Sequence, residues 1–212
     1  MMRKSCTVFG LIILSALPLA AQQAAPAQPA APEANPFFEE WTAPFGMPPF
    51  ERIKAEHFMP AFDRAIAEQR QEVDAIATNA EPPTFENTVV RLEESGLLLR
   101  KVAGVFFSLA SANTNEALQK VQAEAMPKLA ALQDDVALDP RVFARVKKVW
   151  EARETLALDS EQRKLLEESY KSFVRGGANL SDEQQKRFRE INQELSSLST
   201  SFSNNVLAET NA

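Results

Sequence analysis

Residues 181–207 read SDEQQKRFREINQELSSLSTSFSNNVL and carry the clearest structural signal in the chain. Apolar side chains recur there at intervals of three and four residues, at Phe188, Ile191, Leu195, Leu198, Phe202 and Val206. That spacing predicts one face of an α-helix. Ser181 and Gln184 lie three residues apart and suit a capping box at the start of it. We therefore expect a long amphipathic helix in this part of the chain.

Further helices are predicted upstream, because apolar residues recur at the same spacing in segments 58–79, 84–110, 113–136, 139–150 and 159–175. Their predicted N-terminal caps are Thr84, Asn113, Asp139 and Asp159. Pro60 suits the first turn of the first segment, and Pro127 should kink the third. Gly96 and Gly104 indicate a close helix crossing or a local break. Since no window shows sustained two-residue alternation between hairpin turns, we predict an all-α fold of about six helices.

The first 34 residues have a different character. Arg3 and Lys4 precede an apolar run over residues 6–17, and small residues follow at 20 and 21. This is the pattern of a secretory signal peptide over 1–21, and the run is too short to span a bilayer. Residues 22–34 form an Ala/Pro/Gln-rich linker. We expect an exported protein, periplasmic or secreted, with no membrane contact after cleavage.

Residues 35–54 are rich in proline and aromatic residues and follow neither the helical nor the strand period. The aromatic residues are Phe37, Phe38, Trp41, Phe45 and Phe50. Because such rings are too apolar to be left in water, we expect an ordered strap whose rings fill grooves of a helical body. A cage for an aromatic ligand is the alternative. The strap and the helices together make a predicted lobe over residues 35–212.

Composition excludes several classes of protein. Of 212 residues, 45% are hydrophobic and 25% charged, as in soluble globular proteins. Without residues 1–21 the chain has 21 basic and 29 acidic residues, a net charge of −8, which disfavours nucleic acid as a partner. One His and one Cys, His57 and Cys6, cannot build a structural zinc site, a zincin helix or a Cys–His nucleophile. No catalytic or metal-ligating residues are recognised in this chain, and its substrate-binding residues are unknown.

A set of short motifs runs in order through residues 35–212. They are NPF at 35–37, PFGMPPF at 44–50, HFMPA at 57–61, PTFENT at 83–88, LEESG at 92–96, FVRGGANL at 173–180 and INQELSSL at 191–198. This ordered set resembles the opening part of the peptidyl-dipeptidase (dipeptidyl carboxypeptidase) branch of the thimet-oligopeptidase family. Each motif alone is weak, but their common order makes the resemblance specific.

The resemblance implies a fold and an activity. Members of that family are almost wholly helical zinc metallopeptidases, with a deep channel between two lobes that admits short peptides. This branch releases dipeptides from peptide C-termini. Zinc is held by a His-Glu-x-x-His helix and a later Glu in the C-terminal half of such proteins, so none of these residues can be carried over to this sequence. What is left resembles the N-terminal helical lobe, one wall of the channel.

Five other features have structural explanations that we favour over catalytic ones. In the resemblance, His57 belongs to a helix-entry motif, so a cap or a structural hydrogen bond is expected. The neighbouring pairs Glu93-Glu94, Asp134-Asp135 and Glu167-Glu168 each diverge by about 100° around a helix, so we expect solvated charges and not acid–base couples. Arg175-Gly176-Gly177 suits a helix C-terminus with a basic last turn, and a contact to a peptide carboxylate is the alternative.

Two functional hypotheses follow. In the first, the chain is the N-terminal part of an exported zinc peptidyl-dipeptidase that acts on short peptides, and it is inactive alone. The apolar stripe that continues to Leu207 agrees with a chain cut short inside a longer protein, while fraying at a natural terminus would also explain it. In the second, the chain is a stand-alone helical module that binds a peptide or a partner without chemistry. A large exposed apolar face would argue against the second hypothesis.

Overall fold

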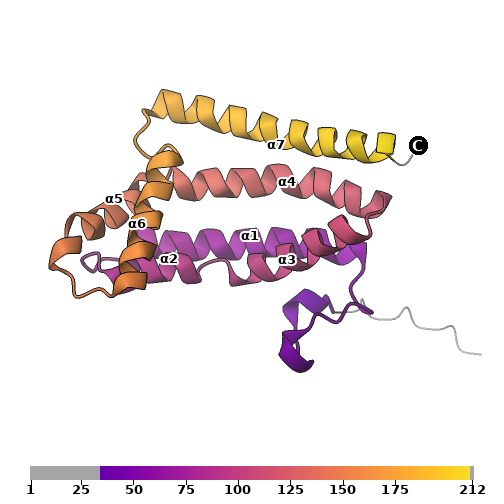
Figure 1. Cartoon of the computed structure of the whole chain (residues 1–212), viewed down its shortest axis with the longest axis horizontal. Coiled ribbons are helices and arrows are strands. Elements are labelled where there is room, and N and C mark those ends of the chain that lie inside the picture. Colours follow the sequence, from indigo (N-terminus) through magenta and orange to yellow (C-terminus); the bar gives the residue numbers. More distant parts are fainter. Residues whose placement is uncertain (1–33, 211–212) are drawn as a thin grey trace, which may run out of the picture. The chain divides into compact units, whose positions relative to one another are not determined.

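The computed structural model describes residues 34–210, so the predicted signal peptide and all but the last residue of the predicted linker lie outside it. Every regular element within 34–210 is helical, which confirms the all-α prediction (Figure 1). The α-helices are α1 (Ala55–Ala77), α2 (Arg91–Glu94), α3 (Leu97–Ala112), α4 (Glu116–Ala137), α5 (Pro140–Glu151), α6 (Ser160–Arg175) and α7 (Asp182–Thr210). Shorter helical turns are η1 (Pro36–Phe38), η2 (Pro44–Gly46), η3 (Phe85–Val90) and η4 (Arg153–Thr155).

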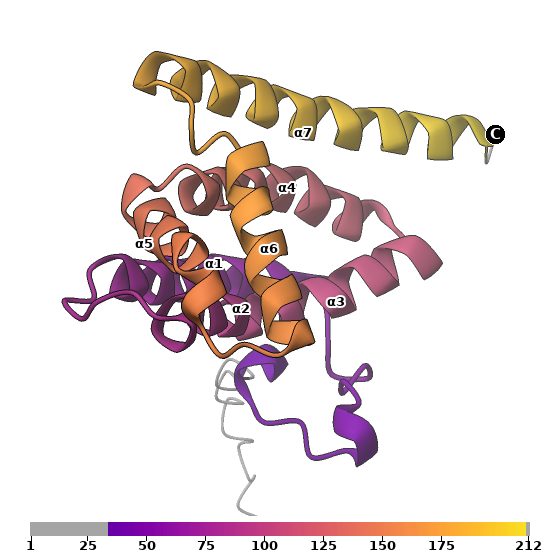
Figure 2. The same cartoon turned by 60° about the vertical axis from the view of Figure 1, so that its left-hand side comes forward.

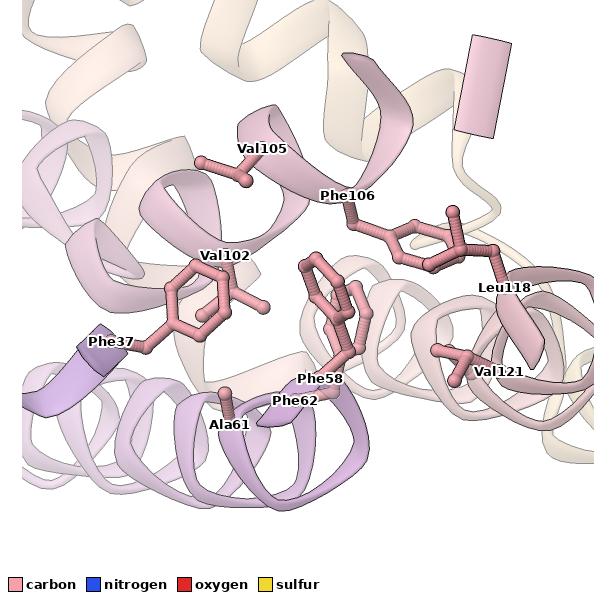
Figure 3. Packing of buried hydrophobic residues seen from close by; sticks show 10 residues of the cluster. Phe37, Phe58, Ala61, Phe62, Val102, Val105, Phe106, Leu118 and Val121 are labelled. Atoms are coloured by element: carbon pink, nitrogen blue, oxygen red, sulfur yellow. The ribbon is translucent and has the colours of Figure 1, made fainter. Parts of the chain in front are cut away.

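The largest core is an aromatic cluster between α1, α3 and α4 (Figures 2 and 3). Phe58 and Phe62 of α1 pack edge-on against Phe106 of α3, with ring centroids 5.1 and 5.4 Å apart. All three rings are buried, and α4 closes the cluster with Leu118 and Val121. Edge-to-face rings add to the hydrophobic stabilisation that burial already gives, so this cluster holds the three helices together.

The entry into α1 explains why that helix starts earlier than the sequence predicted. His57 Nδ1 accepts a hydrogen bond from the Lys54 N–H at 3.0 Å, and the first helical residue is Ala55. The Asn35 side-chain amide donates to the His57 carbonyl at 2.8 Å. The cap expected at His57 is therefore confirmed. The placement of Pro60 in the first turn was wrong, because the helix begins at Ala55, five residues before the proline.

One more helix boundary differs from expectation, and one predicted break is confirmed. The N-cap of α4 is Asn115, whose side chain accepts from the Leu118 N–H at 3.0 Å, and not the predicted Asn113. Helix α4 continues through Pro127 as one element. The second predicted helix is divided at Gly96, which confirms a local break there, whereas α3 runs through Gly104.

The break at Gly96 is a fitted contact with α1. Gly96 has φ = 73°, in the left-handed region, and its N–H donates to a Glu72 carboxylate oxygen at 2.7 Å. A Cβ at this position would lie 2.7 Å from the Gln69 side chain. Only glycine meets both conditions at low cost, so the break lets the backbone approach α1 closely.

The strap over 35–54 is anchored at one end and projects at the other. Phe37 is buried against Phe58, and Lys101 of α3 donates to the carbonyls of Phe37 and Glu39 at 3.0 and 2.7 Å. Partial burial lowers the pKa of Lys101. Phe45, however, is fully exposed. The expectation that the rings fill grooves therefore holds for Phe37 and the half-buried Trp41.

That expectation is wrong for the other three rings of the strap, because Phe38, Phe45 and Phe50 are exposed. Phe45 also has φ = 61°, in the left-handed region that bulky side chains rarely adopt. The strap thus combines an anchored start with an exposed aromatic turn.

Helices α5 and α6 pack on each other next to η3, around Val89, Val149 and Leu166. Arg145 of α5 is buried and donates to the carbonyls of Asn79 and Glu81 at 2.8 and 3.1 Å. A buried guanidinium that satisfies backbone acceptors fixes the connection from α1 to η3 against α5.

The segment Phe85–Ala112 is long and apolar enough to cross a membrane by length and composition alone. It comprises η3, α2 and α3, is interrupted at Gly96, and contributes Val89, Val102 and Phe106 to the cores.

Replacing Gly96 by alanine should lower the free energy of unfolding by about 1–3 kcal/mol, because the left-handed backbone and the contact with Gln69 both disfavour a side chain. Gly104 is the matched control, since it is helical and a Cβ there meets nothing within 4 Å. Gly104→Ala should stabilise by about 0.5–1 kcal/mol. Urea unfolding of the two variants measures both values, and a neutral Gly96→Ala would contradict the fitted break.

Candidate functional site

Helix α7 is attached to α4 through polar groups. Asp134 of α4 is 5% exposed and accepts a hydrogen bond from the Asn192 side chain of α7 at 2.7 Å. Next to it, Asp135 accepts from Arg189 of α7 at 2.9 Å and from Arg70 of α1 at 2.8 Å. The two neighbouring aspartates thus connect three helices.

This node partly corrects the expectation for Asp134-Asp135. The expectation of solvated charges is right for Asp135, whose side chain is 43% exposed. It is wrong for Asp134, because that carboxylate is buried between α4 and α7. Its role is structural: a buried carboxylate needs hydrogen-bond donors, and the donor comes from α7. The exposed ion pairs of Asp135 contribute little stability by themselves.

Five of the six residues in the apolar stripe of α7 are exposed, and the sixth, Phe188, is half-buried. Ile191, Leu195, Leu198, Phe202 and Val206 have 39%, 55%, 57%, 70% and 47% of their surface exposed. The residue of α7 that is most buried is Thr200. The predicted helix is confirmed, and it lies along α4 (Figure 1). Its hydrogen bond to the buried Asp134 comes from the polar Asn192, while most of its apolar stripe is exposed.

A groove of about 880 Å³ runs beside this stripe. Its walls come from α4, from the end of α6 and from α7, and its lining includes Met126, Leu129, Ser172, Arg175, Phe188 and Leu195. A second hollow of about 490 Å³ shares Leu129, Gln133 and Ala137 with it and extends between α3, α4 and α6. The two hollows and the exposed stripe form one surface, which we call the α7 groove.

The remaining sequence candidates lie apart from one another. His57 is buried at the start of α1, where it caps the helix. Glu93 and Glu94 are exposed on α2, as predicted. Glu167 and Glu168 form ion pairs with lysines one turn away on α6, Lys171 and Lys164. Hydrogen bonds from these lysines lower the pKa of Glu167 and of Glu168.

The end of α6 has the structure that its sequence predicted. The Ala178 N–H donates to the Phe173 carbonyl at 3.0 Å, and Gly177 has φ = 95°, in the left-handed region. This is the geometry that closes a helix C-terminus on glycine. Arg175 is exposed in the last turn and lines the α7 groove. Nothing in the sequence pattern indicated that Asp134, Asn192 and Arg175 border the same groove, because they come from three different helices.

The described residues do not fit a zinc site. Within 34–210 no three His, Cys, Asp or Glu side chains come together in a way that could hold a metal ion. The imidazole of His57 is committed to the cap, and Asp134 to Asn192. The lining of the α7 groove combines apolar side chains with polar and charged ones, among them Asp134, Glu168 and Arg175.

Comparison with known proteins finds similarity to the sequences of bacterial peptidases. It is 40% identical to dipeptidyl carboxypeptidase of Escherichia coli over 174 residues, which are 82% of this chain and 26% of that protein. It is 38% identical to dipeptidyl carboxypeptidase of Salmonella typhimurium over 147 residues, which are 69% of this chain and 22% of that protein. Oligopeptidase A of Salmonella typhimurium is 28% identical over 145 residues, which are 68% of this chain and 21% of that protein. No protein-family profile matches the chain.

These similarities confirm the resemblance found in the motifs, and the identity is higher with the dipeptidyl carboxypeptidases than with oligopeptidase A. The chain spans about a quarter of the length of the curated relatives that it matches. What the other three quarters of those proteins contribute is therefore not carried by the matched residues.

Asn192→Ala should lower the free energy of unfolding by about 1–3 kcal/mol, because it removes the donor from a buried carboxylate. Gln193→Ala is the control, since Gln193 is the next residue along α7 and its side chain is exposed. Its effect should stay within about 0.5 kcal/mol. Equilibrium urea unfolding compares the two, and equal effects would show that the Asp134 contact does not hold α7.

Proposed function

We propose that this chain, which belongs to the thimet-oligopeptidase family on the side of its dipeptidyl carboxypeptidases, is the N-terminal helical lobe of an exported zinc peptidyl-dipeptidase. The observation that carries the proposal is the 40% identity to dipeptidyl carboxypeptidase of Escherichia coli over 82% of this chain. The all-α fold supports it, since the family resemblance implies an almost wholly helical protein.

The lobe would form one wall of a channel for short peptides, and the rest of the polypeptide would supply zinc and the groups around it. Two facts support this division of labour. The relatives are about four times as long as the matched segment, and the described residues offer no metal site. The lobe is therefore proposed to be inactive on its own. Its contribution to catalysis would be to shape the channel and exclude folded proteins from it.

Export is proposed from residues 1–21, which have the charged start, apolar run and small-residue site of a signal peptide. With this segment removed, the remaining residues contain no cysteine, since Cys6 is the only one in the sequence. Stability in an oxidising compartment would then come from the aromatic core and not from disulfides.

A stand-alone helical binding module is the second candidate. The buried clusters around Phe106 and Leu166 favour it, because they show that the described residues make hydrophobic cores of their own. The exposed stripe on α7 speaks against it. A self-sufficient module would be expected to bury its largest apolar face.

The enzyme proposal predicts that the purified 212-residue chain neither binds zinc at micromolar concentration nor cleaves a short peptide. Isothermal titration with zinc chloride and chromatography of a blocked pentapeptide test this directly. Zinc binding with a dissociation constant near 1 μM, or release of a dipeptide, would refute the assignment of the metal to other parts of the protein.

A chimera tests the assignment to this family branch. In it, the 174 matched residues of Escherichia coli dipeptidyl carboxypeptidase are replaced by the corresponding residues of this chain. We expect the chimera to release C-terminal dipeptides, and the same protein with the segment deleted to be inactive. A folded chimera without activity would contradict the proposed function.

A further inference from the structure

We propose that the hollow of about 880 Å³ in the α7 groove binds a dipeptide with free termini and apolar side chains, its ammonium group at Asp134 and its carboxylate at Arg175. The inference rests on the proposed function, which makes dipeptides the product of the complete enzyme, and it adds where this lobe would hold them. The residues that line the hollow come from α4, from the end of α6 and from α7.

The carboxylate of Asp134 is the first argument. It is 5% exposed and lines the hollow, and within residues 34–210 its hydrogen-bond donor is the neutral amide of Asn192 at 2.7 Å. An ionised carboxylate can accept about four hydrogen bonds. A buried carboxylate without a cation beside it is also poorly compensated in charge. An ammonium group in the hollow would supply both the charge and further donors.

The guanidinium of Arg175 is the second argument. Arg175 lines the same hollow, and no carboxylate of residues 34–210 forms an ion pair with it. Glu168, the remaining charged residue of the lining, forms its ion pair with Lys164 at 2.7 Å. Since arginine binds carboxylates through two parallel hydrogen bonds, the C-terminus of a peptide suits this position. A contact of this kind is the alternative that the sequence left open for Arg175.

The two charged residues lie close enough for one short peptide. Asp134 and Ala137 are one turn apart on α4, with about 5–6 Å between their Cβ atoms. Gly176, the neighbour of Arg175, lies directly against Ala137, because a Cβ on Gly176 would be 3.0 Å from the Ala137 Cβ. The termini of an extended dipeptide are about 6–7 Å apart, since each residue adds about 3.5 Å. With the long side chain of Arg175, one dipeptide can reach both residues.

The other groups of the hollow suit the rest of a dipeptide. The Ser196 hydroxyl, one turn after Asn192 on α7, is buried and has no hydrogen-bond partner within 34–210, so it is left to bond the peptide group. A hollow of several hundred Å³ with apolar walls and a few converging polar groups is typical of small-molecule sites. The apolar side chains of the lining are Met126, Leu129, Phe188 and Leu195, together with three alanine or glycine positions.

Titration calorimetry of the 212-residue chain with leucyl-leucine tests the proposal. We expect a dissociation constant of about 1 mM or lower. N-acetyl-leucyl-leucine lacks the ammonium group, and leucyl-leucine amide lacks the carboxylate. Each should bind at least about fivefold more weakly than the free dipeptide, because one of the two charged contacts is lost.

Two variants assign the ends of the peptide. Arg175→Gln should weaken leucyl-leucine at least about fivefold and leave the amide unchanged, since the amide has no carboxylate to lose. Asp134→Asn keeps an acceptor for Asn192, and it should weaken leucyl-leucine but not the acetylated peptide. Lys186→Gln is the control, because it removes the same charge as Arg175→Gln from an exposed position of α7 outside the hollow. Its effect should stay within about twofold.

Three results would overturn the proposal: no binding of leucyl-leucine up to about 10 mM, blocked peptides that bind as tightly as the free one, or an Arg175→Gln variant that weakens the amide as much as the free dipeptide. Because Arg175 is exposed, its variant keeps the test valid even if Asp134→Asn unfolds the chain. The titration needs no catalysis. An active chimera whose isolated lobe does not bind leucyl-leucine keeps the function and refutes this site, while a folded, inactive chimera whose isolated lobe binds it does the reverse.

Discussion

The contact between α4 and α7 depends on the buried carboxylate of Asp134. A carboxylate that is 5% exposed must be given donors, and α7 supplies one through Asn192. Meeting that requirement fixes the rotation of α7 about its own axis. Phe188 and Leu195 lie one helical turn from Asn192 and line the groove, while Leu198 and Phe202, further around the helix, are exposed. The groove between α4, α6 and α7 lies beside this buried polar contact, and the exposed part of the apolar stripe borders it.

Helix positions could be predicted from the sequence because apolar spacing and capping residues are local. The periodicity around Phe188 placed α7, and Asp159 placed the start of α6. The starting point of α1 was missed because His57, a residue type that is rarely a cap, forms the first hydrogen bond. Which face of α7 meets α4 could not be predicted, since the periodicity of an amphipathic helix identifies an apolar side but says nothing about its partner. Within residues 34–210, most of that side is exposed.

Long-range polar contacts were the other part that sequence alone could not predict. Arg145 satisfies carbonyls more than sixty residues upstream, and Asp134 finds its donor 58 residues downstream. Neither pairing has a local signature. Histidine and cysteine, which often mark catalytic or metal sites, occur only once each in this chain. The functional evidence therefore came from the ordered motifs and from the relatives. The structure then contributed what those could not, namely the exposed part of the apolar stripe on α7 and the groove beside it.

The labelling rate of single cysteines on α7 tests the orientation of that helix most directly. In a chain with Cys6→Ser, one variant carries Leu198→Cys and the other Thr200→Cys. We expect the cysteine at 198 to react with a maleimide nearly as fast as in a short peptide, and the cysteine at 200 to react at least about tenfold more slowly because its position is buried. Fast labelling at 200 with protection at 198 would show that α7 packs by its apolar face and would contradict the account.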